Sequence, residues 1–175
     1  MENIILVDTN DKPLGEIEKL EAHKTPRLHR AFSVFLYNDK GEILIQKRAQ
    51  GKYHSGGKWA NSCCSHPRAG KTFEQSVSER LLFELGVKNV EWEEIFSFTY
   101  LTEYAKDLYE YEFDHVLVAQ YNGEVFANKE EIENVAWVKV EDIEKMLVKN
   151  PTMFASWFVI CAPKVFAHLR KIQAI

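Results

Sequence analysis

The sequence has little of what marks several large classes of protein. Only three of its 175 residues are cysteine, an odd number without a CxxC spacing, so it predicts neither a disulfide framework nor a cysteine-rich zinc site. Its apolar runs all fall short of the roughly 18 residues that a membrane-spanning helix needs. The first residues lack the basic and apolar segments of a signal peptide. We therefore expect a cytoplasmic protein, in a reducing compartment.

A strong basic excess is also missing. The net charge is -4 at neutral pH, whereas nucleic-acid-binding proteins usually carry a surplus of Lys and Arg. Basic residues are grouped only locally: Lys47, Arg48 and Lys52 form one group, and Arg68 and Lys71 form a second. Groups of this size suit an anionic small molecule. We expect no nucleic acid or membrane as a partner, and a monomer or weak dimer.

The chain has no internal repeat, low-complexity tract or linker. Its apolar share of 46% and charged share of 27% are those of an ordinary globular protein, so we expect one domain over residues 1–175. Apolar and alternating runs bounded by turn residues predict strands at residues 4–7, 31–37, 42–48, 92–100, 109–119 and 136–138. The second and third strands should form a hairpin, and a polar loop should join the fourth to the fifth.

Three helices complete the prediction. The clearest covers residues 73–85, where Thr72 and Gln75 form a capping box and Gly86 is placed to end the helix. Residues 141–148 predict a short helix, and the apolar segment from residue 154 predicts a buried helix that Pro163 kinks or restarts. This order of elements indicates an α/β protein with a mixed sheet sandwiched between helices.

A thiol and an imidazole occur two residues apart in the segment of residues 61–67. In an extended segment such positions project to the same side, so Cys64 and His66 can face one pocket. A reactive cysteine needs a polar, electropositive and partly open setting, which His66, Arg68 and Lys71 could supply. The alternative is a small buried thiol beside a surface histidine, the commoner fate of free cysteine.

A strand with three carboxylates on one face is the second unusual feature. Glu110, Glu112 and Asp114 alternate along residues 109–119 and so share a face. Carboxylates this close repel one another unless a positive charge lies among them. A solvated acidic face is one explanation; a metal site is the one we favour. With His23, His29 and His66 the chain offers a mixed nitrogen and oxygen site, which suits Zn, Mn or Fe better than Ca.

Four segments together resemble type 1 isopentenyl-diphosphate isomerases, a branch of the Nudix fold. They are residues 27–32, 59–67, 84–87 and 110–112, and the likeness extends from about residue 14 to residue 157. The resemblance implies interconversion of isopentenyl diphosphate and dimethylallyl diphosphate in isoprenoid biosynthesis. In that reaction a double bond moves by protonation and deprotonation.

The resemblance also implies a role for each matching residue. It implies one divalent ion, Mn, Zn or Fe, bound by His23, His29, His66, Glu110 and Glu112. Cys64 and Glu112 would transfer protons with help from Tyr100, and Trp157 would stabilise a carbocation with its π face. Glu84 would bind a Mg ion that accompanies the diphosphate, and the diphosphate itself would be bound by Lys19, Arg48, Lys52 and Arg80.

Two other functions compete with this one. A Nudix pyrophosphohydrolase would cleave the diphosphate, using a helix that carries several acidic residues. In the corresponding run Arg80 and Phe83 replace two of the acids and Glu84 remains, too few carboxylates for a Mg cluster. A silent Nudix-like binding module is the second alternative, but it would have no use for Cys64, Glu112 and Trp157.

Overall fold

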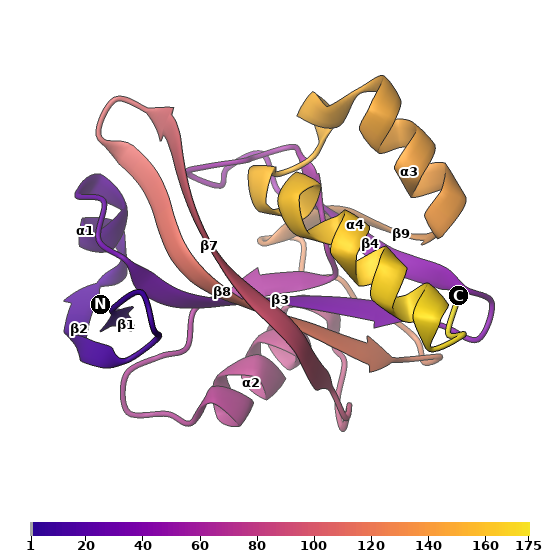
Figure 1. The fold of residues 1–175 in the computed structure, drawn as a ribbon, viewed down its shortest axis with the longest axis horizontal. Coiled ribbons are helices and arrows are strands. Elements are labelled where there is room, and N and C mark those ends of the chain that lie inside the picture. The colour runs from indigo at the N-terminus through magenta and orange to yellow at the C-terminus, as the bar shows by residue number, and fades with distance from the viewer. Residues whose placement is uncertain (1) are drawn as a thin grey trace.

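The architecture centres on one long buried strand. In the computed structural model, which describes residues 2–175, strand β3 has neighbours on both sides within a nine-stranded mixed sheet (Figure 1). The strands are β1 (Asn3–Val7), β2 (Pro13–Glu18), β3 (His29–Tyr37), β4 (Glu42–Arg48), β5 (Trp59–Ala60), β6 (Cys63–Ser65), β7 (Glu93–Ala105), β8 (Leu108–Gln120) and β9 (Ile132–Lys139). The helices are α1 (Lys19–Lys24), α2 (Phe73–Leu85), α3 (Val140–Lys149) and α4 (Ser156–Lys171), with a 3₁₀ turn at Pro151–Met153.

The neighbours of β3 come from distant parts of the chain. Strand β8 pairs with it in parallel from His29 opposite Glu112 to Tyr37 opposite Gln120. Strand β6 pairs with it antiparallel on the other side, so β6 and β8 flank β3. The predicted hairpin between β3 and β4 is correct only at its turn, where Tyr37 faces Ile43. Beyond that point the two strands diverge, and β4 pairs with β9 and β5.

Two hydrophobic cores cover the two faces of this sheet, as the α/β prediction requires. One core contains Phe35, Val116 and Val118 beneath α4, and the other contains Val34 and Leu117 beneath α2. Helices α4 and α2 accordingly lie on opposite sides of β3 and β8 (Figure 1). Alternate residues of each strand therefore face different helices, which decides which side chains can meet in a site.

Helix α2 has the ends that its sequence predicts. Thr72 and Gln75 form both hydrogen bonds of the capping box, and Gly86 ends the helix with a φ of 68°, a conformation that favours glycine. Helix α4 begins at Ser156, two residues later than the apolar segment suggested. It continues through Pro163 to Lys171, so Pro163 does not restart it.

The fourth and fifth predicted strands are longer than expected. Strand β7 extends to Ala105, and only Lys106 and Asp107 separate it from β8. The polar hairpin loop predicted there is correct but shorter than expected, because Asp107 adopts a φ of 60° and closes a two-residue turn. None of the helices within residues 2–175 combines the length and the apolar character needed to cross a bilayer.

Candidate active site and metal centre

Four buried side chains from four elements converge at one end of β3. The ligand atoms of His23, His29, His66 and Glu112 all lie within 4.8 Å of one another. Strand pairing explains the convergence: His29 lies opposite Glu112 in the β3–β8 ladder, and β6 delivers His66 just beyond its last residue. His23 comes from the last turn of α1. The fold thus brings together four predicted ligands that are widely separated in the sequence.

The orientation of two imidazoles fits a bound metal ion. The Nδ1 atom of His23 lies 2.6 Å from the carbonyl oxygen of Lys19, and that of His29 lies 2.7 Å from the carbonyl oxygen of Arg27. A carbonyl oxygen only accepts, so we assign the proton to Nδ1 in both rings. The Nε2 lone pairs are then left for the cluster, which is the arrangement that metal-binding histidines usually show.

The remaining imidazole and the carboxylate complete the group. His66 Nε2 lies 2.8 Å from Glu112 Oε1, and His29 Nε2 lies 3.6 Å from the same oxygen. Burial lowers the pKa of His66 to about 3, so this ring is neutral at physiological pH. Within residues 2–175, His29 Nε2 and His66 Nδ1 have no hydrogen-bond partner although both are buried. Imidazole rings and a carboxylate that point together suit a divalent cation such as Zn, Mn or Fe.

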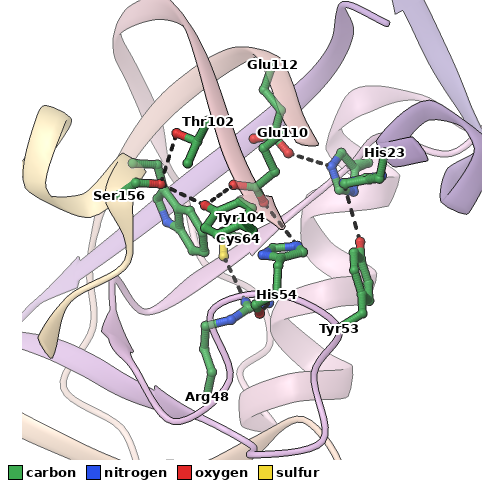
Figure 2. A network of polar contacts seen from close by, with 12 residues as sticks. His23, Arg48, Tyr53, His54, Cys64, Thr102, Tyr104, Glu110, Glu112 and Ser156 are labelled. Atoms are coloured by element: carbon green, nitrogen blue, oxygen red, sulfur yellow. Dashed lines mark hydrogen bonds and ion pairs between the residues drawn. The ribbon is translucent and has the colours of Figure 1, made fainter. Parts of the chain in front are cut away.

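The fifth predicted ligand, Glu110, lies beside this group rather than within it. Its Oε1 atom lies 3.1 Å from His54 Nε2, and its Oε2 atom accepts a hydrogen bond from Tyr104 at 2.6 Å (Figure 2). Oε2 also accepts one from Tyr100 at 3.1 Å. His23, His54 and Glu110 form a second group whose ligand atoms lie within 4.8 Å. His54 was not predicted from the sequence. The only signal was its place in a glycine-rich polar loop, the kind of segment that often carries function.

The two carboxyl groups have opposite proton affinities. Burial, and then the charge of Glu112, raise the pKa of Glu110 well above its usual value. Burial acts in the same direction on Glu112, but the facing rings of His29 and His66 hold its pKa well below the usual value. The Tyr100 hydroxyl lies 2.7 Å from Glu112 Oε2 and can donate to either carboxylate. Glu112 is therefore the ionised member of the pair.

Cys64 faces this cluster, and its neighbour Cys63 faces away from it. Cys64 and His66 line one pocket, whereas Cys63 is fully buried in the core beneath α2. Burial raises the pKa of Cys64 to about 12, so the thiol keeps its proton at neutral pH. Its sulfur lies 3.7 Å from Nη1 of Arg48 (Figure 2). The prediction that Cys64 and His66 face one pocket is therefore correct.

Trp157 forms a wall of the same pocket from the first turn of α4. Its indole N–H donates to Asn61 Oδ1 at 2.9 Å, which fixes the plane of the ring. The guanidinium carbon of Arg48 lies 5.3 Å from the ring centroid, within the range of a cation–π contact. Arg48 therefore contacts both the thiol and the indole.

The other predicted cations gather near the mouth of the pocket around an acidic residue that the sequence did not suggest. Lys52 and Arg80 both pair with Glu131, and Arg80 also pairs with Glu84 one helical turn later. Lys19 lines the same pocket, and burial lowers its pKa. His29 and Tyr100 contact the two carboxylates from outside the pocket lining, and His23 lies within 4.8 Å of them. All other predicted site residues line the pocket: Lys19, Arg48, Lys52, Cys64, His66, Arg80, Glu84, Glu110, Glu112 and Trp157.

Known proteins resemble this chain in both sequence and fold. The NUDIX domain family matches residues 27–158. The isopentenyl-diphosphate Delta-isomerase of Photobacterium profundum is 45% identical over 164 residues, 90% of this chain and 90% of that protein. That of one Aliivibrio fischeri strain is 40% identical over 179 residues, 98% of this chain and 99% of that protein.

Solved structures with the same fold are more distant in sequence. The crystal structure of DR0079 from Deinococcus radiodurans matches with a TM-score of 0.70 at 22% identity, covering 85% of this chain and 90% of that one. The MutT protein from Methanosarcina mazei Go1 matches with a TM-score of 0.63 at 16% identity, covering 83% and 95%. At these identities the likeness concerns the fold alone.

Proposed function

The chain belongs to the Nudix family and, within it, to the isopentenyl-diphosphate Delta-isomerases, and we propose that the buried histidine and glutamate cluster is its catalytic metal centre. The protein is an enzyme that interconverts isopentenyl diphosphate and dimethylallyl diphosphate. Its substrate is therefore a small diphosphate with a five-carbon tail. What remains to be assigned is which side chains perform each part of the reaction.

We assign one divalent ion, Mn, Zn or Fe, to His23, His29, His66 and Glu112, with Glu110 beside them. The support is the position of Nε2 in His23 and His29, which lies close to a buried carboxylate oxygen of Glu112. Nε2 of both rings keeps its lone pair, because Nδ1 is bonded to a backbone carbonyl. A metal bound there would supply positive charge that holds Glu112 in place and lowers its proton affinity. The protein's own part is to keep these ligands dry and oriented.

Cys64 and Glu112 are the proposed pair of proton-transfer groups. They come from β6 and β8, which flank β3, with Cys64 opposite Ser33 and Glu112 opposite His29. Their backbones are therefore separated by two strand spacings, about 10 Å, across the sheet and by four residues, about 13 Å, along it. One group adds a proton to one end of the three-carbon unit, and the other removes a proton from the opposite end. The double bond shifts, one group has lost a proton and the other has gained one, and the substrate's composition is unchanged. Either direction is chemically balanced, as a reversible isomerisation requires.

Trp157 and Tyr100 are the proposed supports for this chemistry. Protonation of the alkene creates a tertiary cation, and an indole face stabilises a cation by roughly 2 kcal/mol when water is excluded. The contact of Arg48 with the Trp157 ring supports this role, because it indicates that a cation can lie against that face. Tyr100 donates to Glu112 and so restrains the carboxylate that exchanges the proton.

The proposed diphosphate site consists of Lys19, Lys52 and Arg80. Arg48 also contacts the diphosphate, and Glu84 binds the accompanying Mg ion. Their shared pocket supports this assignment. We further propose that the chain acts as a single domain over residues 1–175, as a monomer or weak dimer. A cytoplasmic setting is proposed as well, because a catalytic Cys64 must stay reduced.

The observation that carries the proposal is the common pocket of Cys64, Glu112 and Trp157. The test is to incubate the purified protein with isopentenyl diphosphate and Mg, and to follow dimethylallyl diphosphate and phosphate together. The expected result is isomer without phosphate. Phosphate release from a substrate whose double bond has not moved would instead favour the pyrophosphohydrolase, and neither product would favour a silent binding module.

A further inference from the structure

His54 is a buried imidazole to which the reaction described above assigns no part. It lies in the loop between β4 and β5, and its side chain is 5% exposed. Its Nε2 atom lies 3.1 Å from Glu110 Oε1, and Glu110 is itself 4% exposed at the side chain. Because a buried polar pair must satisfy itself internally, this contact is part of how Glu110 is held.

The ring of His54 also contacts the two halves of the active site. It stacks on Tyr104 with centroids 5.1 Å apart, and on His23 with centroids 5.8 Å apart. Its edge meets Trp157 at 6.0 Å. The backbone carbonyl of His54 accepts a hydrogen bond from Arg48 at 3.4 Å. One side chain therefore touches a metal-ligand candidate, a carboxylate and the indole wall.

The two ring nitrogens of His54 lie in different surroundings. Nε2 lies beside Glu110 Oε1. Nδ1 is buried, and within residues 2–175 it has no hydrogen-bond partner. The ring therefore meets the cluster through Nε2 and Glu110.

Glu110 is consequently restrained on both oxygens. Oε2 receives the hydroxyl of Tyr104, which also lies 2.7 Å from Ser156 Oγ in the first turn of α4 (Figure 2). Oε1 receives His54. If His54 were absent, only tyrosine hydroxyls would hold the carboxylate, both through Oε2. They would draw the carboxylate towards the tyrosines and away from the imidazole cluster.

We propose that His54 is a positioning residue of the metal centre, whose ring lies against Glu110 and keeps its carboxylate directed at the imidazole cluster. This inference rests on the proposed metal centre. It differs from direct ligation because His54 acts through Glu110 rather than on the metal ion. A glutamine side chain can place a polar group near the position of Nε2, whereas alanine cannot, and this difference makes the proposal testable.

The experiment compares His54→Ala and His54→Gln with the unmodified protein. Each protein is stripped of metal and titrated with Zn in competition with a chromophoric chelator, and its folding is checked by thermal unfolding. Loss of a side chain that orients a ligand typically costs 10- to 100-fold in metal affinity, so we expect about that loss for His54→Ala. We expect His54→Gln to remain within about threefold of the unmodified protein.

His115→Gln is the matched control. His115 is also an imidazole bonded to carboxylates, Asp11 and Glu94, but it packs against Phe73 of α2, the helix on the other face of the sheet. This variant should bind Zn as the unmodified protein does. Isomerase assays at saturating Zn and Mg give a second readout: His54→Ala should lower kcat more than it changes KM, with partial recovery in His54→Gln.

The outcomes separate this inference from the one on which it rests. Equal losses of Zn affinity in both His54 variants would mean direct ligation and overturn the positioning role. Unchanged affinity in a folded His54→Ala would also overturn it while leaving the metal centre intact. Failure of the unmodified protein to bind Zn, Mn or Fe would refute the metal centre itself, and the inference with it.

Discussion

Replacing each of the two adjacent thiols by alanine tests the proposed pocket directly. Cys64 lines the pocket with His66 and Glu112, whereas Cys63 packs against Val34 and its neighbours in the core beneath α2. The two substitutions remove the same atom from neighbouring positions of one short strand. Any difference between them therefore reports the direction of the side chain rather than the local sequence.

The expected magnitudes are far apart. A positioned proton-transfer group contributes about 10²- to 10⁴-fold to rate, equivalent to about 2.7–5.5 kcal/mol of activation free energy, and Cys64→Ala should lose an amount in this range. Cys63→Ala removes one buried sulfur, and a void of that size costs roughly 1 kcal/mol of stability. Its kcat should stay within about threefold of the unmodified protein.

The assay follows conversion of isopentenyl diphosphate to dimethylallyl diphosphate at saturating substrate, Mg and Zn, with a thermal unfolding curve for each variant. Cys64→Ala should be folded but nearly inactive, and Cys63→Ala should be active but slightly less stable. Equal loss of activity in the two variants would refute the assigned geometry. So would a Cys64→Ala enzyme that retains most of its kcat.

Three further predictions concern the indole, the metal and the diphosphate site. Trp157→Phe keeps an aromatic face and should lose less than about 10-fold in kcat, whereas Trp157→Ala should lose at least about 30-fold, the equivalent of roughly 2 kcal/mol; identical kcat values would leave Trp157 a purely structural role. Removing metal with a chelator should abolish turnover and lower Tm, because Glu112 and the imidazole lone pairs lose their counter-charge, and adding Zn or Mn should restore both; an unchanged Tm would argue against a bound ion. Glu131→Gln should lower KM for isopentenyl diphosphate severalfold, since it releases Lys52 and Arg80 from a competing carboxylate; a higher KM would show that Glu131 orients these cations instead.

Local features of the fold were predictable because their causes are local. Thr72, Gln75 and Gly86 specify the ends of α2 through hydrogen bonds and a backbone conformation that involve only nearby residues. The shared face of Glu110 and Glu112 follows in the same way from the period of a strand. Each of these predictions is correct without any knowledge of which other strand lies alongside.

Features that depend on distant pairing were not predictable in the same way. The β3–β4 hairpin opens after one residue pair because β6 and β8, which come much later in the chain, flank β3. His54 and Glu131 were missed for a related reason. Neither belongs to a spaced motif, and each takes part in the site only through a partner that is distant in the sequence. The partner of His54 is Glu110, and the partners of Glu131 are Lys52 and Arg80.

Helix α2 explains why a Nudix fold serves here for isomerisation rather than hydrolysis. Cleavage of a diphosphate needs Mg ions held by several carboxylates beside the phosphate. At the pocket, α2 presents Glu84, and the guanidinium of Arg80 already pairs with it and with Glu131. Phe83, where the hydrolase pattern has a second acid, is about half exposed instead. In the proposed site the diphosphate end of the substrate would thus meet mainly cations, which bind it without activating water, and the proposed proton-transfer groups, Cys64 and Glu112, would face its hydrocarbon end.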